Sequence, residues 1–241
     1  MPSFKQRSYK KELLDRDDIP FAHIKRNMQE LDFINRNLGG HDITLDGIVA
    51  LITGQPIFNR QLTIIEIGCG GGDNLRAVKD WAAHIKLPVL LMGIDFNEEC
   101  VTYAKSVERN SGIQFIHSDY KLMSLTTKPD IVFSSLFCHH FTDDELIFQL
   151  QWMQQNCTLG FFINDLQRHP LAYYSIKLLT TIFSKSYLVK NDAPLSVQRG
   201  FKRADWKRLF MAAHIENYSC RWRWAFRWLV TCINNAEADQ V

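Results

Sequence analysis

The chain has 241 residues, of which 46% are hydrophobic and 22% are charged, a composition that excludes a wholly disordered chain. Twenty-eight basic residues stand against 26 acidic ones, and a formal charge of +2 gives no reason to expect a general nucleic-acid-binding protein. We expect no membrane span, because the longest apolar runs, such as residues 89–92, are too short to cross a bilayer.

The first twenty residues alternate charges and contain no signal-peptide core, so we expect a cytoplasmic protein. The cysteines include no C-x-x-C pair, which gives a zinc site no support and predicts reduced, buried thiols. There are six of them: Cys69, Cys100, Cys138, Cys157, Cys220 and Cys232.

Residues 1–60 are predicted to form a helical cap that belongs to the same domain as the rest of the chain. One helix should end at Gly39-Gly40, as at a C-cap, and a second could cover residues 44–54. The periodic apolar positions that predict the first helix are Ile24, Met28, Leu31 and Leu38.

From residue 61 to residue 241, short apolar strands alternate with amphipathic helices. This alternation predicts an α/β domain with a doubly wound, mostly parallel, seven-stranded, Rossmann-like sheet, whose ligands bind beyond the carboxyl ends of the strands. The third of the helices should begin with a capping box formed by Thr142 and Glu145. The parallel strands are expected at Leu62–Ile67, Val89–Ile94, Ile113–His117, Ile131–Phe137 and Phe161–Asn164.

The C-terminal region has a different pattern. Tryptophan or phenylalanine occupies every even position of residues 221–228, and arginine occupies three of the four odd positions. A period of two predicts a strand, and residues 215–220 and 229–233 would complete an antiparallel pair at one sheet edge. We expect its aromatic face to be buried and its arginines to be solvated, although RNA or membrane-surface binding is conceivable for such a segment.

The strongest motif is a glycine loop that directly follows a buried strand, Glu66-Ile67-Gly68-Cys69-Gly70-Gly71-Gly72-Asp73. Glycines let the backbone turn sharply against a ligand, and the start of the next helix suits an anionic group. A dinucleotide fingerprint would have its third glycine where Asp73 stands, and Glu66 would gain nothing beside a pyrophosphate. A nicotinamide oxidoreductase is therefore disfavoured, and a ligand with both a cationic and an anionic end fits better.

The pattern Glu66-x-Gly68-x-Gly70-x-Gly72 resembles the first motif of class I S-adenosylmethionine-dependent methyltransferases, and the resemblance is close over about residues 60–165. It implies that this loop holds the methionine end of S-adenosylmethionine and that S-adenosylhomocysteine is the product. It also implies that Asp95 binds the ribose hydroxyls and that Asp119 faces the adenine. The cofactor-binding residues expected from it are Glu66, Gly68, Cys69, Gly70, Gly72, Asp95, Phe96, Asp119, Tyr120, Ser134 and Ser135.

Either aspartate could instead cap the helix that follows it. For Asp95 this alternative is disfavoured because Asn97 is the better-placed cap. For Asp119 the alternative stays open.

Residues 130–141 resemble the fourth motif of the same family, whose strand leads to the transfer site. Methyl transfer requires an aligned nucleophile that loses its proton, and a phenol is mostly protonated at neutral pH. Histidine titrates in the right range, so His139 or His140 is the candidate base, although either could merely bond the backbone. No metal is expected, because adjacent histidines should point apart and no third ligand is suitably spaced.

Residues 12–15, 34–40, 164–170 and 192–201 look like segments of a subset of small-molecule methyltransferases associated with polyketide, quinone or phenolic pathways. The likeness implies an inserted cover helix at about residues 168–200, which with the N-terminal helices would exclude water from the transfer site. Candidate substrate-binding residues are Asp165, Arg168, Arg199 and Tyr174. Asp165 and Arg199 could equally form a structural ion pair, and Tyr174 could belong to the core.

The sequence thus predicts a methyltransferase for a small phenolic, quinone or polyketide-type acceptor, with O-methylation favoured over C-methylation. The alternative is an RNA methyltransferase or nucleic-acid-binding protein that uses the basic, aromatic C-terminal strands. The expected oligomeric state is a monomer or a homodimer.

Overall fold

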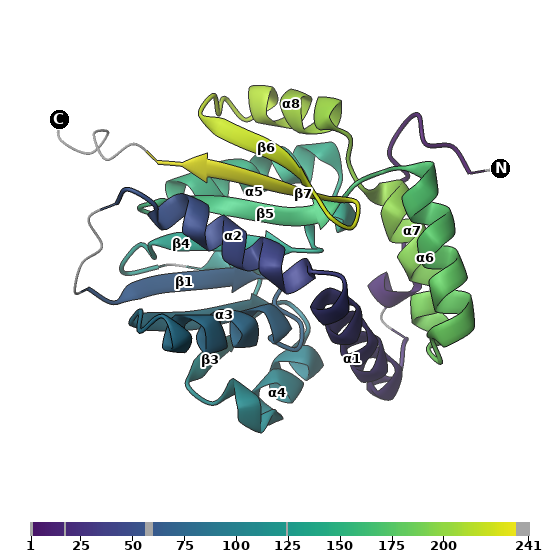
Figure 1. Ribbon diagram of the computed structural model, residues 1–241, viewed down its shortest axis with the longest axis horizontal. Coiled ribbons are helices and arrows are strands. Elements are labelled where there is room, and N and C mark those ends of the chain that lie inside the picture. The colour runs from purple at the N-terminus through teal and green to yellow at the C-terminus, as the bar shows by residue number, and fades with distance from the viewer. Residues whose placement is uncertain (1, 17, 56–59, 124, 235–241) are drawn as a thin grey trace.

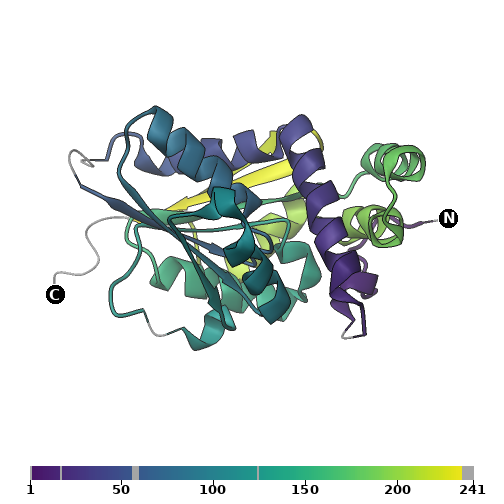
Figure 2. The same ribbon diagram turned by 90° about the horizontal axis from the view of Figure 1, so that it is seen from below.

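A computed structural model describes residues 2–16, 18–55, 60–123 and 125–234. A seven-stranded sheet lies between helices on both faces, and three further helices gather at one end of it (Figures 1 and 2). The three are α1, α6 and α7, with the bounds Phe21–Asn37, Pro170–Phe183 and Tyr187–Arg199.

The strands form a mostly parallel sheet in the order β3-β2-β1-β4-β5-β7-β6. Only β7 runs against its neighbours, and it pairs with β5 on one side and with the edge strand β6 on the other. This arrangement confirms the predicted fold class. The bounds are β1 Leu62–Ile67, β2 Val89–Asp95, β3 Ile113–His117, β4 Ile131–Ser135, β5 Gly160–Leu166, β6 Tyr218–Arg223 and β7 Arg227–Ile233.

The remaining helices cover the two faces of the sheet. Thr142 and Glu145 form the predicted capping box at the start of α5, with the Glu145 amide 3.4 Å from the Thr142 hydroxyl. The bounds are α2 Gly40–Ile52, α3 Asp73–His84, α4 Glu98–Ser106, α5 Asp143–Gln155 and α8 Arg203–Ala212. Short 3₁₀ turns are found at η1 Leu13–Asp15, η2 Glu108–Asn110, η3 Tyr120–Leu122 and η4 Cys138–His140.

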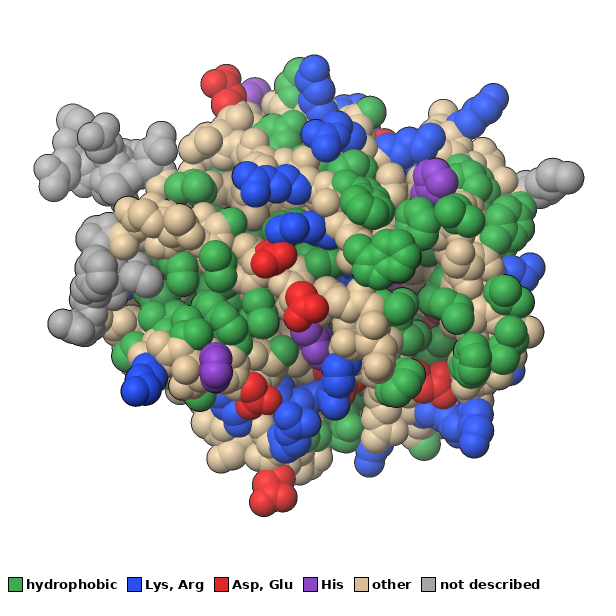
Figure 3. All heavy atoms as spheres, in the orientation of Figure 1, with side chains coloured by type: hydrophobic (Ala, Val, Ile, Leu, Met, Phe, Trp, Pro, Cys, Tyr) green, Lys and Arg blue, Asp and Glu red, His purple; other side chains and the backbone are tan. Residues whose placement is uncertain are grey.

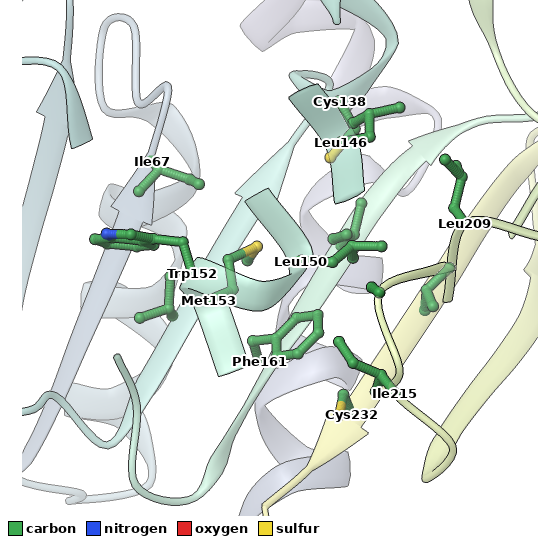
Figure 4. Packing of buried hydrophobic residues seen from close by; sticks show 14 of the residues in the cluster. Ile67, Cys138, Leu146, Leu150, Trp152, Met153, Phe161, Leu209, Ile215 and Cys232 are labelled. Carbon is green, nitrogen blue, oxygen red and sulfur yellow. The ribbon is translucent and has the colours of Figure 1, made fainter. Parts of the chain in front are cut away.

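Two hydrophobic cores hold these layers together. One lies between the sheet and α2, α3 and α4, and the other lies between the sheet and α5 and α8. Figure 4 shows part of the second core, where Leu150 and Met153 of α5 lie near Phe161 of β5 and Leu209 of α8. Burying a side chain of this size contributes about 1.5–3 kcal/mol, so the cores fix the strand ends at which a ligand can bind.

The C-terminal antiparallel pair forms as predicted, and Trp228 is buried and Arg221 is exposed as expected, but the prediction is wrong for other residues. Residues 224–226 form a turn between β6 and β7, so the period of two runs across a turn and not along one strand. Trp222 and Trp224 are exposed, whereas Arg227 is buried and donates a 2.7 Å hydrogen bond to Asn35 Oδ1. Burial lowers the pKa of Arg227 to about 10.

The N-terminal region and the insertion also differ from the prediction. Residues 2–12 contain no helix, and the second helix begins at Gly40, directly after the αL residue Gly39. The insertion holds two helices, α6 and α7, in place of one. The apolar stripe of α6 is exposed, and Figure 3 shows hydrophobic side chains gathered on that side of the molecule; the exposed stripe consists of Leu171, Tyr174, Leu178 and Ile182.

All six cysteines are free, and all but the half-buried Cys220 are buried, largely as predicted. Within the described part of the chain, no helix combines the length and apolar character needed to cross a membrane.

Candidate active site

A cavity of about 980 Å³ opens beyond the carboxyl ends of the parallel strands. Its floor is formed by the loops that follow β1, β2 and β4, and its cover is formed by α1, α6, α7 and the N-terminal segment. The apolar side chains of the cover include Ile24, Met28, Leu31, Ile34, Ile176 and Leu179. The sequence placed the site at this edge of the sheet because parallel strands end there together.

The glycine loop turns the chain sharply from β1 into α3. Gly68 and Gly70 have φ angles of 70° and 48°, in the left-handed region that favours glycine. The amides of Gly68 and Cys69 both donate to the carbonyl oxygen of Ile94, at 2.8 and 3.2 Å. A Cβ atom at Gly68 would overlap the ring of Phe137, so this position has no room for any other residue.

Asp95 connects the first two strand ends. Its Oδ2 accepts a 2.7 Å hydrogen bond from the Gly70 amide, and its Oδ1 accepts one of 2.9 Å from the Asn97 amide. Asn97 itself caps α4 by accepting from the Cys100 amide, as the sequence predicted. Burial raises the pKa of Asp95 despite these two bonds, and the carboxylate lines the cavity.

Glu66 presents a buried carboxylate at the other end of the loop. Its Oε1 accepts a 3.1 Å hydrogen bond from Asn74, but Oε2 has no partner among the described residues. Burial, together with the nearby charges of Asp73 and Asp95, raises the pKa of Glu66 well above its ordinary value. A cationic group in the cavity would supply the missing partner.

The third strand end presents Asp119 and Tyr120. Asp119 lines the cavity and also accepts a 3.0 Å hydrogen bond from the Lys121 amide, so the capping alternative holds for η3. Tyr120 is buried, and its ring contacts Trp152 edge-on at 5.1 Å. Phe96 is exposed at the rim of the cavity.

His139 and His140 lie side by side, and the prediction that they point apart is wrong. Leu136, with a φ angle of 52°, turns the chain out of β4 into η4. Successive side chains of a 3₁₀ turn are separated by about 120°, not by the 180° of a strand. The two imidazole ring centroids are therefore 4.4 Å apart, and both rings line the cavity.

A carboxylate holds the Nδ1 atom of each histidine. Asp165 Oδ1 lies 2.7 Å from Nδ1 of His139, and Asp15 Oδ1 lies 2.8 Å from Nδ1 of His140. Burial raises the pKa of Asp165, but the charge of His139 and its hydrogen bond outweigh burial and lower it. In the same way, the bond and charge of His140 hold the pKa of Asp15 at about 2.

Glu12 faces both histidines from the N-terminal segment. It is buried, accepts a 2.7 Å hydrogen bond from Ser196, and has its pKa raised to about 7 by burial. Neither Glu12 nor Asp15 was predicted as a functional residue. The only signal in the sequence was the stretch Glu12–Asp15, which resembled the small-molecule subset without indicating a role.

Arg199, at the end of α7, ties this cluster together. It donates hydrogen bonds to the carbonyl oxygens of His139 and His140, at 2.9 and 2.6 Å, and reaches Asp15 at 3.2 Å. Asp165 bonds the imidazole ring of His139, and Arg199 bonds the carbonyl oxygen of the same residue. His139 therefore lies between Asp165 and Arg199, in place of the direct ion pair that was the predicted alternative. Both residues are buried, but only Arg199 lines the cavity, whereas Asp165 lies behind His139.

Four other predicted site residues do not line the cavity. Arg168 is buried and donates to the Gly200 carbonyl and to Asp205, while Tyr174 lies on the exposed stripe of α6. Gly72 is the N-cap of α3, and the Ser134 hydroxyl lies 3.4 Å from Cys138 Sγ. Their direct roles in binding stay predictions, whereas Ser135 and Cys69 do line the cavity.

The cofactor implied by the resemblance fits the donors at the loop. S-adenosylmethionine carries an ammonium group that would satisfy the unpartnered oxygen of Glu66. The lone pairs of Asp95 that remain free can accept from ribose hydroxyls. The Cβ-free backbone of the loop allows the close approach that its amino-acid end requires.

Comparisons with known proteins agree with this geometry. Residues 58–191 match the model of a family described as a methyltransferase domain, and no curated protein gives a significant match. The plantazolicin methyltransferase BpumL, in complex with a pentazolic desmethylPZN analog and SAH, has a TM-score of 0.59 and 20% identity, over 85% of this chain and 74% of its own.

Two further solved structures are similar. The magnesium protoporphyrin IX methyltransferase ChlM from Synechocystis PCC 6803, with bound SAH, has a TM-score of 0.53 and 15% identity, over 84% of this chain and 87% of its own. A putative O-methyltransferase from Nostoc punctiforme PCC 73102 has a TM-score of 0.51 and 13% identity, over 78% of this chain and 56% of its own. At such identities the likeness shows the fold alone.

Proposed function

Because the chain belongs to the methyltransferase-domain family, we propose that it transfers the methyl group of S-adenosylmethionine to a hydroxyl oxygen of a small, largely apolar acceptor. The acceptor class that we favour is phenolic, quinone-like or polyketide-like. One observation carries this proposal: a single cavity joins the carboxylates of Glu66 and Asp95 to the polar cluster at His139 and His140.

The cofactor end follows from the donors of the loop. Glu66 receives the ammonium group, and Asp95 receives the ribose hydroxyls. The structural neighbours BpumL and ChlM are described with bound SAH, which supports the same cofactor here. Asp119 and Tyr120 border the place left for the adenine.

The acceptor end follows from the lining of the cover. Apolar side chains of α1 and α6 suit a flat or flexible hydrocarbon body, and a cavity of about 980 Å³ has room for it beside the cofactor. His139 and His140 lie where a hydroxyl at the polar end would be activated. In the reaction, the hydroxyl proton passes to His139 or His140, the oxygen forms a bond to the methyl carbon, and the electrons of the carbon–sulfur bond pass to sulfur.

We do not extend the proposal to RNA. Four of the eight basic residues between positions 199 and 227 are engaged within the molecule: Arg199 and Arg227 are buried, and Arg208 and Arg223 pair with Asp143 and Asp46. No observation in the described residues favours a nucleic-acid surface over this use.

Calorimetry on the purified chain tests the cofactor half of the proposal. We expect S-adenosylhomocysteine to bind, and Asp95→Asn to weaken it by about 10- to 100-fold through the loss of charge-assisted hydrogen bonds. Asp80→Asn is the matched control, because Asp80 is an exposed aspartate that pairs with Arg109. Absence of binding to the wild-type chain, or equal affinity in Asp95→Asn, would overturn the cofactor assignment.

A labelled methyl group tests the acceptor half. Transfer from labelled S-adenosylmethionine to members of a panel of phenols and quinols is the expected result. Transfer to carbon or nitrogen of the same compounds, with the hydroxyl left free, would refute O-methylation while keeping the enzyme class.

A further inference from the structure

Three potential ligand atoms converge at the polar end of the cavity. Glu12, His139 and His140 each offer one atom, and these atoms lie within 4.8 Å of one another. Nε2 of His139 is 3.8 Å from Oε1 of Glu12, and Nε2 of His140 is 3.9 Å from Oε2. Both distances are too long for hydrogen bonds, but atoms that bind one metal ion at about 2.1 Å are spaced by about 3–4 Å.

The two histidines are held as metal ligands are held. The Nδ1 atom of each lies within 2.8 Å of a carboxylate oxygen, supplied by Asp165 for His139 and by Asp15 for His140. An ionised carboxylate only accepts, so each Nδ1 carries a ring proton, and in the neutral form of the imidazole the lone pair is on Nε2. Neither Nε2 atom makes a hydrogen bond with any described residue, although His139 is only 3% exposed.

The charge of the cluster also suits a cation. Glu12, Asp15 and Asp165 bring three carboxylates, against the single guanidinium of Arg199. Arg199 Nε lies 3.7 Å from Glu12, but its N–H groups donate to the backbone carbonyls of the histidines. With neutral imidazoles and with Glu12 ionised, as a metal ligand must be, two negative charges are left for a divalent ion to balance.

We propose that Glu12, His139 and His140 bind one divalent transition-metal ion of the zinc class. Two imidazoles and one carboxylate suit zinc and its transition-metal neighbours, whereas magnesium and calcium prefer oxygen ligands alone. All three residues line the cavity, so the fourth coordination position opens toward the acceptor. From the sequence no metal was expected, because the spacing could place neither the two rings together nor Glu12 beside them.

The role of the ion rests on the proposed function, whereas its binding does not. A hydroxyl oxygen in the open position loses its proton to water more readily, because the ion stabilises the resulting anion. The oxygen lone pair then forms the bond to the methyl carbon, and the electrons of the carbon–sulfur bond pass to sulfur. The hydroxyl proton thus goes to water and the methyl group goes to the oxygen, so the step requires no further reactant.

A second cluster provides an internal comparison. Asp32, His41 and Asp73 also bring ligand atoms within 4.8 Å of one another. There, Asp32 is already paired with Arg76 at 2.9 Å and with Arg36 at 3.1 Å, so less charge is left for an ion. His41→Ala is therefore the matched control for His140→Ala.

Calorimetry with Zn²⁺ and visible spectroscopy with Co²⁺ on the chelator-treated full chain test the proposal. We expect one ion to bind per chain. Its affinity should fall by about 100-fold or more in Glu12→Gln and in His140→Ala, and it should be unchanged in His41→Ala. Asp165→Asn should weaken binding by about 10- to 100-fold, because it releases Nδ1 of His139. Glu12→Gln keeps the shape of the side chain and carries the test if His140→Ala fails to fold.

Absence of ion binding to the wild-type chain, or equal binding in Glu12→Gln and wild type, would overturn the site. S-adenosylhomocysteine is titrated into the same samples. Binding of S-adenosylhomocysteine without binding of the ion would refute the metal site but not the proposed function. Binding of the ion without binding of S-adenosylhomocysteine would support the metal site and refute the proposed function.

Discussion

The two ends of the cavity are built in different ways. At the cofactor end, Glu66, the glycines and Asn74 come from one short stretch, and backbone amides bond it to the next strand. At the acceptor end, side chains from four distant segments meet, and His140 and Asp15 are separated by 125 positions. The first end can form as soon as β1 and β2 pair, whereas the second requires the N-terminal segment and α7 to dock.

If this contrast is right, Arg199→Met should have the largest effect on stability and should act at the acceptor end alone. It leaves the carbonyls of His139 and His140 without this donor, and it removes one of the partners of the Asp15 carboxylate. We expect a loss of about 3–5 kcal/mol in the free energy of unfolding, measured by urea denaturation. Methyl transfer should fall with it, while S-adenosylhomocysteine affinity should stay within about threefold.

Arg208→Met is the matched control, because Arg208 is half-exposed and, among the residues that the structure describes, forms a salt bridge with Asp143 alone. It should cost about 1 kcal/mol or less. An equal loss of cofactor affinity in Arg199→Met would show that the two ends are not separable.

Gly68→Ala should have the next largest effect, and it should act at the cofactor end. The added Cβ overlaps the ring of Phe137, and the φ angle of 70° is unfavourable for alanine. Together these costs predict a loss of about 2–4 kcal/mol in unfolding free energy and a large loss of cofactor affinity.

Gly112→Ala separates the two causes. Gly112 has a φ angle of 85°, but no atom of the described residues lies within 4 Å of the added Cβ, so only the backbone cost of about 1–2 kcal/mol is expected. Equal effects of the two variants would show that close packing against Phe137 does not matter.

The same contrast explains how much could be predicted from the sequence. The strand, the glycines and Asp95 follow one another within about 30 positions, and each has a local physical signature. The sequence therefore predicted the fold, the glycine loop and the cap at Asn97. It could not show that Glu66 keeps an unpartnered oxygen, because this depends on the neighbours that bury it.

The acceptor end was predicted only in part. His139, His140, Asp165 and Arg199 were identified as candidates, but their mutual contacts depend on the turn at Leu136. Glu12 lies in a stretch of alternating charges that resembles a solvated surface, and only docking against Ser196 and the histidines buries it.

Periodicity misled where apolar residues face outward. The stripe of α6 has the spacing of a buried face, yet Leu178 and Ile182 are each 62% exposed. In the C-terminal region, the alternation of aromatic residues and arginines spans the turn at residues 224–226. Spacing records which residues share a face, but packing decides which face is covered.

The smallest effect is expected from Glu66→Gln, and it sharpens the comparison through pH. The pKa of Glu66 is raised by burial above the ordinary 4.5, so the folded chain binds this proton more tightly than the unfolded chain. Its contribution to stability is therefore greatest below pH 4.5 and declines as the pH rises toward the folded-state pKa. Thermal unfolding of the ligand-free Glu66→Gln variant should lack this decline, so the variant should be at least as stable as wild type at neutral pH.

The affinity of Glu66→Gln for S-adenosylhomocysteine should nevertheless fall about 10-fold, because the ammonium group loses its anionic partner. The exposed Glu99→Gln is the control and should change neither quantity; a clear destabilisation of Glu66→Gln would instead mean that the carboxylate is satisfied without a ligand.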